Sequence, residues 1–347
     1  MNKIRVAING FGRIGRAFFK LAQYKSEEME IVAINDLSSI DNITYLLKYD
    51  SAYGRAPFKI SFSDGLLKAN DKEIKYLSER EPSNLPWKDL KIDVVLESTG
   101  VFASYEKSKA HLDAGAKRVV ISAPVKDEPM NGITGATVLM GVNEEKLRVC
   151  DISSNASCTT NAGGSVIQIL EESLGIEKAL LNTVHGYTSS QSLVDSPNPK
   201  NKRRGRAGAY NIVPSTTGSA IATTKAIESL RGKFDGIALR VPVIVGSIAD
   251  ITFISKRDTT TEEVNEIFKK AASEERWKGI FTVTDEDIVS SDIIGNTHAS
   301  IVDLEYTRVV GGNLVKVLSW YDNEMGYSST LLKHVIATGK YAITSAS

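Results

Sequence analysis

The sequence has few cysteines and no excess of charge, and each shortage excludes a class of protein. Only two of the 347 residues are cysteine, which excludes a disulfide scaffold and favours a reducing compartment. Lysine plus arginine and aspartate plus glutamate each number 42, so the net charge is zero. A protein without net charge has no global field to attract DNA or an anionic membrane. We therefore expect no nucleic acid as the main partner.

Long apolar runs and repeats are also missing. No stretch approaches the ~18 consecutive apolar residues that a membrane span needs. The first residues, "MNKIRVAINGFG", lack the cleavage pattern of a signal peptide, and we find no internal repeat. The sequence therefore predicts a cytoplasmic protein without membrane contact. Its length allows about two domains of ~100–200 residues each.

The two halves of the chain differ in their pattern of strands and helices. In the first half, expected strands alternate with expected helices, which is typical of a parallel sheet built from βαβ units. The strands are expected at 4–9, 30–36, 91–100 and 117–124, and the helices at 16–24 and 104–116. After residue 158, long strand-like runs at 240–255 and 313–323 and an amphipathic helix at 261–275 indicate an α+β domain.

A glycine-rich turn follows the first strand. "GFGRIG" at 10–15 matches G-x-G-x-x-G, opens a helix, and is followed by Asp36, 21 residues after Gly15, at the end of the second strand. This context is typical of a Rossmann-type site for a dinucleotide, in which the acid binds the ribose hydroxyls. Asp36 would repel a 2′-phosphate, which favours NAD over NADP. "STG" at 98–100 would add small residues near the dinucleotide. A glycine turn with an unrelated aspartate, and an ordinary strand-ending turn at 98–100, are the alternatives.

One of the cysteines lies in an unusual setting. Cys158, in "SNASCTTN", is surrounded by small hydroxyl and amide residues at an expected strand-to-helix turn, which gives a thiol access and backbone N–H groups. The alternative is a polar turn with an incidental cysteine. Beside a nicotinamide cofactor, a thiolate permits aldehyde oxidation through a hemithioacetal and a thioester.

That chemistry needs a base, and the chain has four histidines. His111 and His334 lie in expected helices, where a role on the helix surface is favoured. His185 ends an apolar run that leads into a long polar loop, which suits a catalytic base. A capping or core histidine is the alternative at this position.

A second polar centre at 198–218 combines basic residues with "STTG". Its cations could form a nucleic-acid patch, a localisation signal or a solvated loop. Together with Arg240 and the threonine hydroxyls, they also suit a phosphorylated aldehyde and a second anion pocket. The basic residues are Lys200, Lys202, Arg203, Arg204 and Arg206.

Four motifs, in this order and at these spacings, give the chain a family resemblance. "INGFGRIGR", "SNASCTTN", "RVP" and "SWYDNEMGYS" resemble phosphorylating glyceraldehyde-3-phosphate dehydrogenases over nearly the whole length. The resemblance implies NAD-dependent oxidation of glyceraldehyde 3-phosphate to 1,3-bisphosphoglycerate, with inorganic phosphate releasing the product from a cysteine thioester. It also implies a homotetramer in which the loop at 186–210 reaches a neighbour's cofactor site.

The resemblance assigns a role to each matching position, and no metal. The catalytic residues would be Cys158 and His185. The cofactor residues would be Gly12, Arg13, Ile14, Asp36, Arg80, Thr99, Ser122 and Asn323. The residues for the substrate phosphate would be Thr188 and Arg240, and those for inorganic phosphate Ser157, Thr159, Arg204, Thr217 and Gly218. The implied domains are 1–157 for NAD and 158–323 for catalysis, with a C-terminal helix at 324–347 that returns to the first.

The sequence departs from the family pattern at three places. Ala162 replaces a frequent second cysteine, "VPVIVGS" at 241–247 is less polar than usual, and 131–143 is longer than usual. An erythrose-4-phosphate dehydrogenase, which hydrolyses its thioester, is the nearest alternative function. A scaffold or RNA-binding protein that uses the basic loop is an alternative of a different class.

Overall fold

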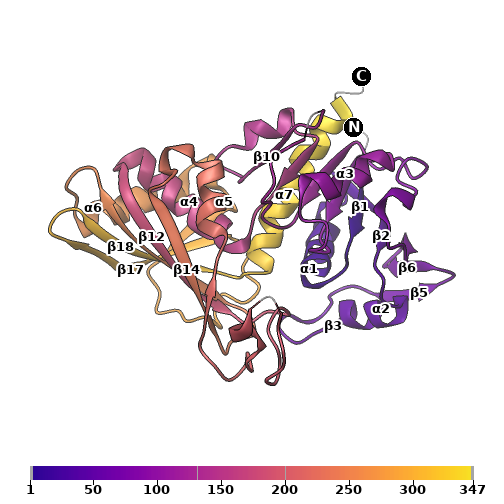
Figure 1. Cartoon of the computed structure of the whole chain (residues 1–347), viewed down its shortest axis with the longest axis horizontal. Helices are drawn as coiled ribbons and strands as arrows, with labels where there is room; N and C mark the ends of the chain where they lie inside the picture. The colour runs from indigo at the N-terminus through magenta and orange to yellow at the C-terminus, as the bar shows by residue number, and fades with distance from the viewer. Residues whose placement is uncertain (1–2, 131, 200, 345–347) are drawn as a thin grey trace. The chain divides into compact units, whose positions relative to one another are not determined.

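The chain folds into two compact units, each with its own sheet. The structure is a computed structural model that describes residues 3–130, 132–199 and 201–344. The first unit contains the residues up to Ala156 together with those from Ser328 onward, and the second unit is Ser157–Tyr327. Figure 1 follows the chain through both units. Lys200, in the basic run noted above, lies outside the described residues.

The first unit is built on a nine-stranded sheet whose order is β10-β11-β9-β8-β1-β2-β7-β6-β5. Neighbouring strands from β10 to β7 are parallel, and β6 and β5 are added antiparallel. Its strands are β1 (Ile4–Asn9), β2 (Met29–Asn35), β5 (Ile60–Ser63), β6 (Leu66–Ala69), β7 (Lys72–Leu77), β8 (Val94–Glu97), β9 (Arg118–Ile121), β10 (Gly135–Thr137) and β11 (Ile152–Ser154). The strands β3 (Tyr49–Asp50) and β4 (Gly54–Arg55) form a separate pair.

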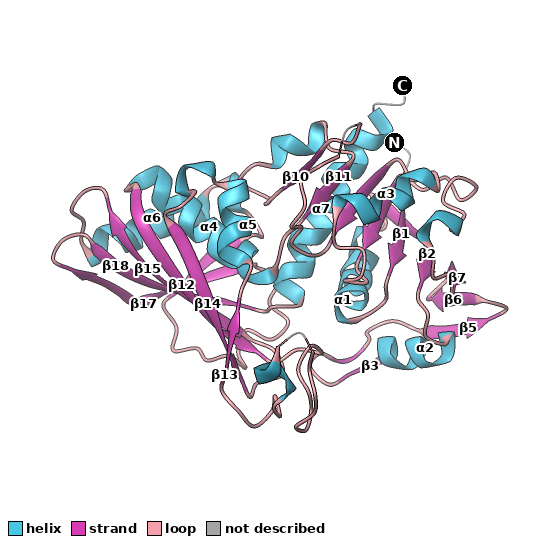
Figure 2. Cartoon of the chain, in the orientation of Figure 1, coloured by secondary structure: helices cyan, strands magenta, loops and turns pink. Residues whose placement is uncertain are grey.

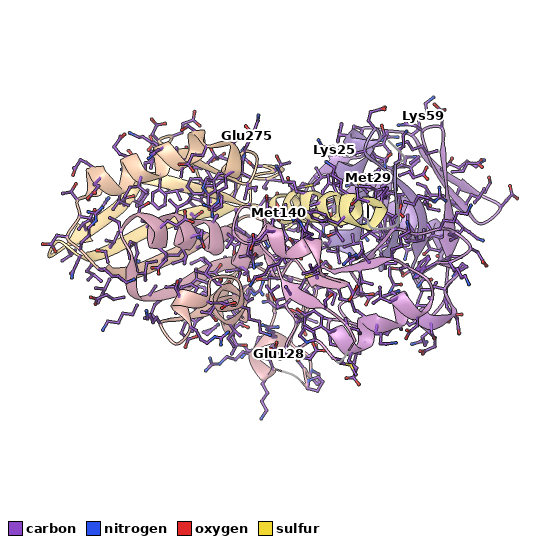
Figure 3. The ribbon with its side chains drawn as sticks, turned by 90° about the horizontal axis from the view of Figure 1, so that it is seen from above. Lys25, Met29, Lys59, Glu128, Met140 and Glu275 are labelled. Carbon is purple, nitrogen blue, oxygen red and sulfur yellow. The ribbon has the colours of Figure 1, made fainter. Side chains whose placement is uncertain are left out.

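Helices accompany this sheet as the βαβ pattern requires. They are α1 (Arg13–Ala22), α2 (Ile40–Lys48), α3 (Tyr105–Asp113) and the C-terminal α7 (Met325–Thr344) (Figure 2). Apolar residues of β1 and β8 are fully buried, as expected for parallel strands covered on both faces. Met29, at the start of β2, is also buried, whereas Lys25 and Lys59 extend from the surface of the unit (Figure 3).

The second unit is a mixed seven-stranded sheet in the order β13-β14-β12-β15-β18-β17-β16. Its strands are β12 (Ile176–Gly186), β13 (Val213–Thr216), β14 (Phe234–Val241), β15 (Ser247–Ser255), β16 (Phe281–Thr284), β17 (Ser300–Val310) and β18 (Leu314–Tyr321). Its helices are α4 (Cys158–Ser173), α5 (Ser219–Ala226) and α6 (Thr261–Ser273). Buried and half-buried residues alternate along β15, so one face of this sheet is covered more fully than the other.

The expected α/β and α+β architectures are therefore present, but two expectations were wrong in detail. The run at 240–255 is two strands, because Pro242 lacks a ladder donor and Gly246 has a φ of 95°. His111 and His334 are fully buried and are not surface residues of their helices.

Candidate active site

Cys158 is the first residue of α4. Ala156 adopts a φ of 55°, which turns the chain sharply after β11, and Ser157 then caps the helix. The Ser157 hydroxyl accepts a hydrogen bond from the Thr160 backbone N–H at 3.1 Å. This cap begins the helix at the cysteine, so the partly buried thiol lies at the positive end of the helix dipole.

Strand register brings His185 and Arg240 side by side. β12 and β14 pair in parallel, with His185 directly opposite Arg240. The imidazole Nε2 of His185 lies 3.3 Å from the Cys158 Sγ, within hydrogen-bond distance of a thiol. The structure therefore joins the start of α4 to the carboxyl end of β12, and a nucleophile faces a base.

The second nitrogen of His185 has two neighbours that compete for it. Its Nδ1 lies 2.7 Å from the carbonyl oxygen of Gly186, which can only accept a hydrogen bond. It also lies 2.6 Å from the Arg240 Nη1, which can only donate one. Gly186 therefore favours the tautomer in which Nε2 can accept a proton from Cys158, whereas Arg240 favours the opposite tautomer.

The electrostatics favour neutral forms of both catalytic groups. Burial raises the pKa of the Cys158 thiol, and the nearby Arg240 charge opposes that shift. Burial, followed by repulsion from Arg240, lowers the pKa of His185 to about 3. His185 is therefore a neutral imidazole at rest and does not stabilise a resting thiolate as a cation. Arg240 is the cation that favours the thiolate.

Tyr321 is part of this site and was missed from the sequence. Its hydroxyl lies 2.9 Å from the Thr159 Oγ1 and 2.7 Å from the Thr183 Oγ1. Its ring meets the His185 ring edge-on at 6.0 Å between centroids. Tyr321 thereby ties β18 to α4 and β12, and it gives the Thr159 hydroxyl one hydrogen-bond partner within the protein. Its position in "SWYDN" was the available signal.

The expected phosphate residues have separate settings in this unit. Among the described residues, the buried Nε of Arg240 has no hydrogen-bond partner, which leaves a charged donor for an anion. The Arg204 guanidinium donates to Ser215 Oγ at 2.8 and 2.7 Å, and its charge also lowers the pKa of His185.

The remaining phosphate residues follow strands. Thr188 comes two residues after β12, and its hydroxyl lies 2.9 Å from Ser190 Oγ. Thr217 follows β13, and its Oγ1 accepts from the Ser219 backbone N–H at 3.1 Å. Gly218 precedes α5, and no described heavy atom lies within 4 Å of the position of an added Cβ. The segment of Thr217 and Gly218 therefore offers polar groups, and Gly218 offers open space, at the start of α5.

In the first unit, a cavity of about 320 Å³ lies at the carboxyl ends of the parallel strands. Its lining includes Gly10, Gly12, Asp36, Arg80 and Thr99. Strand ends of this kind are where α/β sheets bind ligands. The expected cofactor residues of the glycine turn, of β2 and of the turn after β8 are therefore brought together.

The glycine turn leaves the space that a dinucleotide requires. A Cβ on Gly10, whose φ is 92°, would lie 2.6 Å from the Thr99 backbone nitrogen, so only glycine fits there. A Cβ on Gly12 would meet no described heavy atom within 4 Å, and it would occupy the approach to the start of α1. These observations fit a pyrophosphate held at the helix N-terminus.

The carboxylate of Asp36 accepts hydrogen bonds from the glycine turn and from the loop that follows β2. Its Oδ2 accepts from the Phe11 backbone N–H at 2.7 Å, and its Oδ1 accepts from the Ser38 backbone N–H at 2.9 Å. Both oxygens keep further lone pairs for ribose hydroxyls.

Three further expected cofactor residues have distinct environments. The Arg13 side chain pairs with Asp50 at 2.9 Å. Ile14 is half-buried in the first turn of α1, and Ser122 follows β9, where its backbone N–H bonds the Glu97 carbonyl at 2.9 Å.

Asn323 belongs to the second unit. Its Oδ1 accepts from Gly246 N at 3.1 Å and from Ser247 Oγ at 3.0 Å, which orients the side-chain amide.

Comparison with known proteins identifies the family of the chain. A family model described as "Glyceraldehyde 3-phosphate dehydrogenase, NAD binding domain" matches residues 4–105, and its "C-terminal domain" counterpart matches 157–323. The chain belongs to the glyceraldehyde-3-phosphate dehydrogenase family. The NAD-binding model covers the glycine turn, Asp36 and Thr99. The dinucleotide that this family's domain binds is NAD.

Relatives named glyceraldehyde-3-phosphate dehydrogenase align with almost the full chain. The protein from Thermotoga maritima is 49% identical over 330 residues, which cover 94% of this chain and 97% of the relative. Those from Mycobacterium avium and Streptomyces coelicolor are 46% and 45% identical, and each alignment covers 97% of this chain and at least 98% of the relative.

No described helix is long and apolar enough to cross a membrane. Within the same residues, no group of three or more histidine, cysteine or acidic side chains is arranged to hold a metal ion.

Proposed function

We propose that this chain is an NAD-dependent, phosphorylating glyceraldehyde-3-phosphate dehydrogenase. The observation that carries the proposal is the 3.3 Å contact between Cys158 Sγ and His185 Nε2, with the Arg240 guanidinium on the far side of the same imidazole. A thiol, a base and an anion-binding cation together suit an aldehyde that carries a phosphate. Nothing favours the erythrose 4-phosphate alternative.

The first step is proton transfer within the catalytic pair. Neutral His185 takes the thiol proton through Nε2, and the resulting thiolate of Cys158 adds to the aldehyde carbon. The imidazolium then gives this proton to the carbonyl oxygen as the thiolate adds, which forms the hemithioacetal hydroxyl and leaves His185 neutral again. A substrate phosphate that draws Arg240 away from Nδ1 leaves Gly186 as the partner of that nitrogen, and this tautomer keeps Nε2 able to act as the base.

The second step releases an acyl phosphate. His185 removes the hydroxyl proton of the hemithioacetal as it is oxidised to the thioester. NAD, when bound, supplies the acceptor of the hydride that leaves in this oxidation. Inorganic phosphate then attacks the thioester carbonyl, the Cys158 sulfur leaves as thiolate, and 1,3-bisphosphoglycerate is formed.

The site residues divide between the ligands as follows. Arg240 and Thr188 hold the substrate phosphate, and Ser157, Thr159, Arg204, Thr217 and Gly218 surround inorganic phosphate. The pyrophosphate is bound by the backbone of Gly12, Arg13 and Ile14, and the ribose is bound by Asp36. The rest of the dinucleotide in the first unit contacts Arg80, Thr99 and Ser122. Asn323 orients the nicotinamide amide.

A homotetramer in the cytoplasm completes the proposal. Several large apolar side chains of the second unit are exposed on the single chain, and apolar surface of this kind is what a contact between copies would bury. Leu180 and Ile237, on the neighbouring strands β12 and β14, are 65% and 56% exposed. Leu193 and Tyr210, in the loop at 186–210, are 80% and 85% exposed. Contact with further copies of the chain would cover them. Sedimentation at micromolar concentration tests the tetramer, and a monomer would contradict it.

The decisive experiment is a steady-state assay of NADH formation with two aldehydes, each with and without inorganic phosphate. We expect glyceraldehyde 3-phosphate to give the higher kcat/KM and turnover to require phosphate. Preference for erythrose 4-phosphate without a phosphate requirement would contradict the proposal.

A further inference from the structure

A buried carboxylate lies behind the dinucleotide cavity without lining it. Glu97, the last residue of β8, is 1% exposed and accepts hydrogen bonds on both oxygens. Its Oε1 accepts from the backbone N–H of Thr99 at 2.8 Å and from the Thr99 hydroxyl at 2.5 Å. Its Oε2 accepts from the Asn9 side-chain amide at 2.6 Å and faces His111 Nε2 at 3.1 Å.

The protonation state of His111 follows from its other neighbour. The indole N–H of Trp87, which can only donate, lies 3.0 Å from His111 Nδ1. That nitrogen therefore carries no proton, and the neutral imidazole carries its proton on Nε2. It follows that His111 donates to Glu97 and that the contact is a hydrogen bond to a neutral ring rather than an ion pair.

A second chain of hydrogen bonds runs to Glu97 from the opposite direction. The side-chain amide of Asn35 donates to Asn9 Oδ1 at 2.7 Å, which fixes the orientation of the Asn9 amide so that its Nδ2 faces Glu97, with His111 Nε2 at 3.4 Å. Asn35 also pairs with the backbone of Glu79, accepting from its N–H and donating to its carbonyl at 2.8 Å each. The polarities of both chains therefore converge on one carboxylate, and such chains strengthen each of their bonds.

The segments that these bonds join are the ones that line the cavity. Asn9 ends β1, Asn35 precedes Asp36 at the end of β2, Glu79 precedes Arg80, and Thr99 begins the turn after β8. All four line the cavity, whereas Glu97, His111 and Trp87 do not. A substitution of Glu97 would therefore change the cavity by displacing the residues that line it.

We propose that Glu97 is a positioning residue for NAD. Its ionised carboxylate holds Asn9 and Thr99, and through Asn35 the Glu79–Arg80 segment, in the arrangement that accepts the dinucleotide. Trp87 supports it by fixing the tautomer of His111. This inference rests on the NAD site of the proposed function and assigns Glu97, His111 and Trp87 no contact with the cofactor.

The acceptor geometry explains why a carboxylate is required. Four donors face Glu97, and an ionised carboxylate is acceptor-only. The isosteric Glu97→Gln variant would turn one oxygen into an N–H₂ group that opposes either the Thr99 donors or those of Asn9 and His111. A buried donor that faces another donor loses its partner, which disturbs the segment that carries it.

The test is the dissociation constant of NAD and of ADP-ribose, measured by calorimetry on the unmodified and variant proteins. We expect Glu97→Gln to weaken both ligands by roughly 10- to 100-fold. ADP-ribose should lose as much as NAD because the network lies in the first unit and does not involve the nicotinamide. The rate of Cys158 alkylation without cofactor and kcat at saturating NAD should stay within about twofold, a split that general unfolding would not produce. The matched control is Glu73→Gln on β7, an exposed carboxylate paired with Lys68.

A second pair of variants keeps the test decisive if Glu97→Gln folds poorly. Trp87→Phe removes only the indole donor, and we expect it to weaken NAD binding by about two- to fivefold. Trp277→Phe, which changes an equally buried tryptophan of the other unit, should leave it unchanged. NAD affinity within twofold of the parent in both Glu97→Gln and Trp87→Phe overturns the positioning role and leaves the proposed function intact. A parent protein that does not bind NAD would instead overturn the proposed function.

Discussion

Replacing Arg240 with methionine separates recognition of the substrate phosphate from the chemistry at the thiol. The side chain belongs to a half-buried residue, and its Nε has no hydrogen-bond partner among the described residues. Its Nη1 contacts His185 Nδ1 at 2.6 Å and donates to the Gly186 carbonyl at 3.1 Å. Methionine keeps most of the side-chain volume but removes the charge and the planar donors.

The size of the effect follows from the donors that are lost. A hydrogen bond from a charged group contributes about 1.5–3 kcal/mol, so the loss of a forked contact to phosphate should cost roughly 3 kcal/mol, or about 100-fold in kcat/KM. A second effect acts through charge. Without Arg240, the pKa of the Cys158 thiol rises further and the pKa of His185 rises from about 3. That electrostatic change affects phosphorylated and unphosphorylated aldehydes equally, so the ratio of their kcat/KM values isolates the phosphate contact.

The assay compares kcat/KM for glyceraldehyde 3-phosphate and for glyceraldehyde at saturating NAD and inorganic phosphate. We expect the ratio of the two values to fall about 100-fold in Arg240→Met and by less in Arg240→Lys, which keeps the charge without the fork. Arg204→Met is the matched control, because Arg204 is directed to Ser215 and is proposed to serve inorganic phosphate. It should raise the KM for inorganic phosphate and leave the ratio unchanged. An Arg240→Met variant that loses activity equally on both aldehydes would show that Arg240 has only a structural role.

Three further predictions concern the thiol, the cofactor and pH. Iodoacetamide should label Cys158 before Cys150, because burial raises the pKa of Cys150 to about 11, and faster labelling at Cys150 would overturn the mechanism. The Cys158→Ser variant should have no turnover, and the His185→Asn variant should turn over roughly 10²–10⁴-fold more slowly. NAD should be preferred over NADP by at least about tenfold because Asp36 faces the position of a 2′-phosphate, and equal kcat/KM values would refute that role. Burial lowers the pKa of His334 to about 3 from 6.5, so the folded protein holds this ring neutral. The contribution of the neutral ring to the free energy of unfolding is therefore fully present above about pH 6.5. It is lost as the pH falls toward 3, by up to about 1.4 kcal/mol per pH unit. His334→Gln should therefore flatten the fall in Tm between about pH 6.5 and 4.5, and an unchanged slope would contradict this.

Features encoded in neighbouring residues could be predicted from the sequence. The strand at 4–9, the glycine turn and Asp36 form one short βαβ unit, so local pattern alone predicted the NAD-binding domain and a place for its site. The helix expected at 261–275 is observed as Thr261–Ser273, with Thr260 as its cap. Cys158 was identifiable because its polar setting differs from that of a core cysteine.

Features that depend on the register between distant strands could not be predicted from the sequence. Nothing local indicates that His185 lies opposite Arg240, 55 positions away in the chain, or that Tyr321 reaches Thr159. The shift of both catalytic groups toward neutral forms also depends on this packing, because burial and the Arg240 charge arise only when β12, β14 and α4 meet.

The histidines illustrate the same division. A nine-residue helix such as α3 does not reveal which of its faces meets the sheet, so His111 was expected at the surface, yet it lies at 0% exposure between Trp87 and Glu97. Asn9 and Glu97 are 88 positions apart and touch because β1 and β8 are neighbours in the parallel sheet. The sequence by itself determined the fold class and the cofactor and predicted the nucleophile, because those depend on short-range pattern and residue chemistry. The tertiary structure decided which polar groups are buried together, and thereby their protonation and their partners, because strand order and register set these contacts.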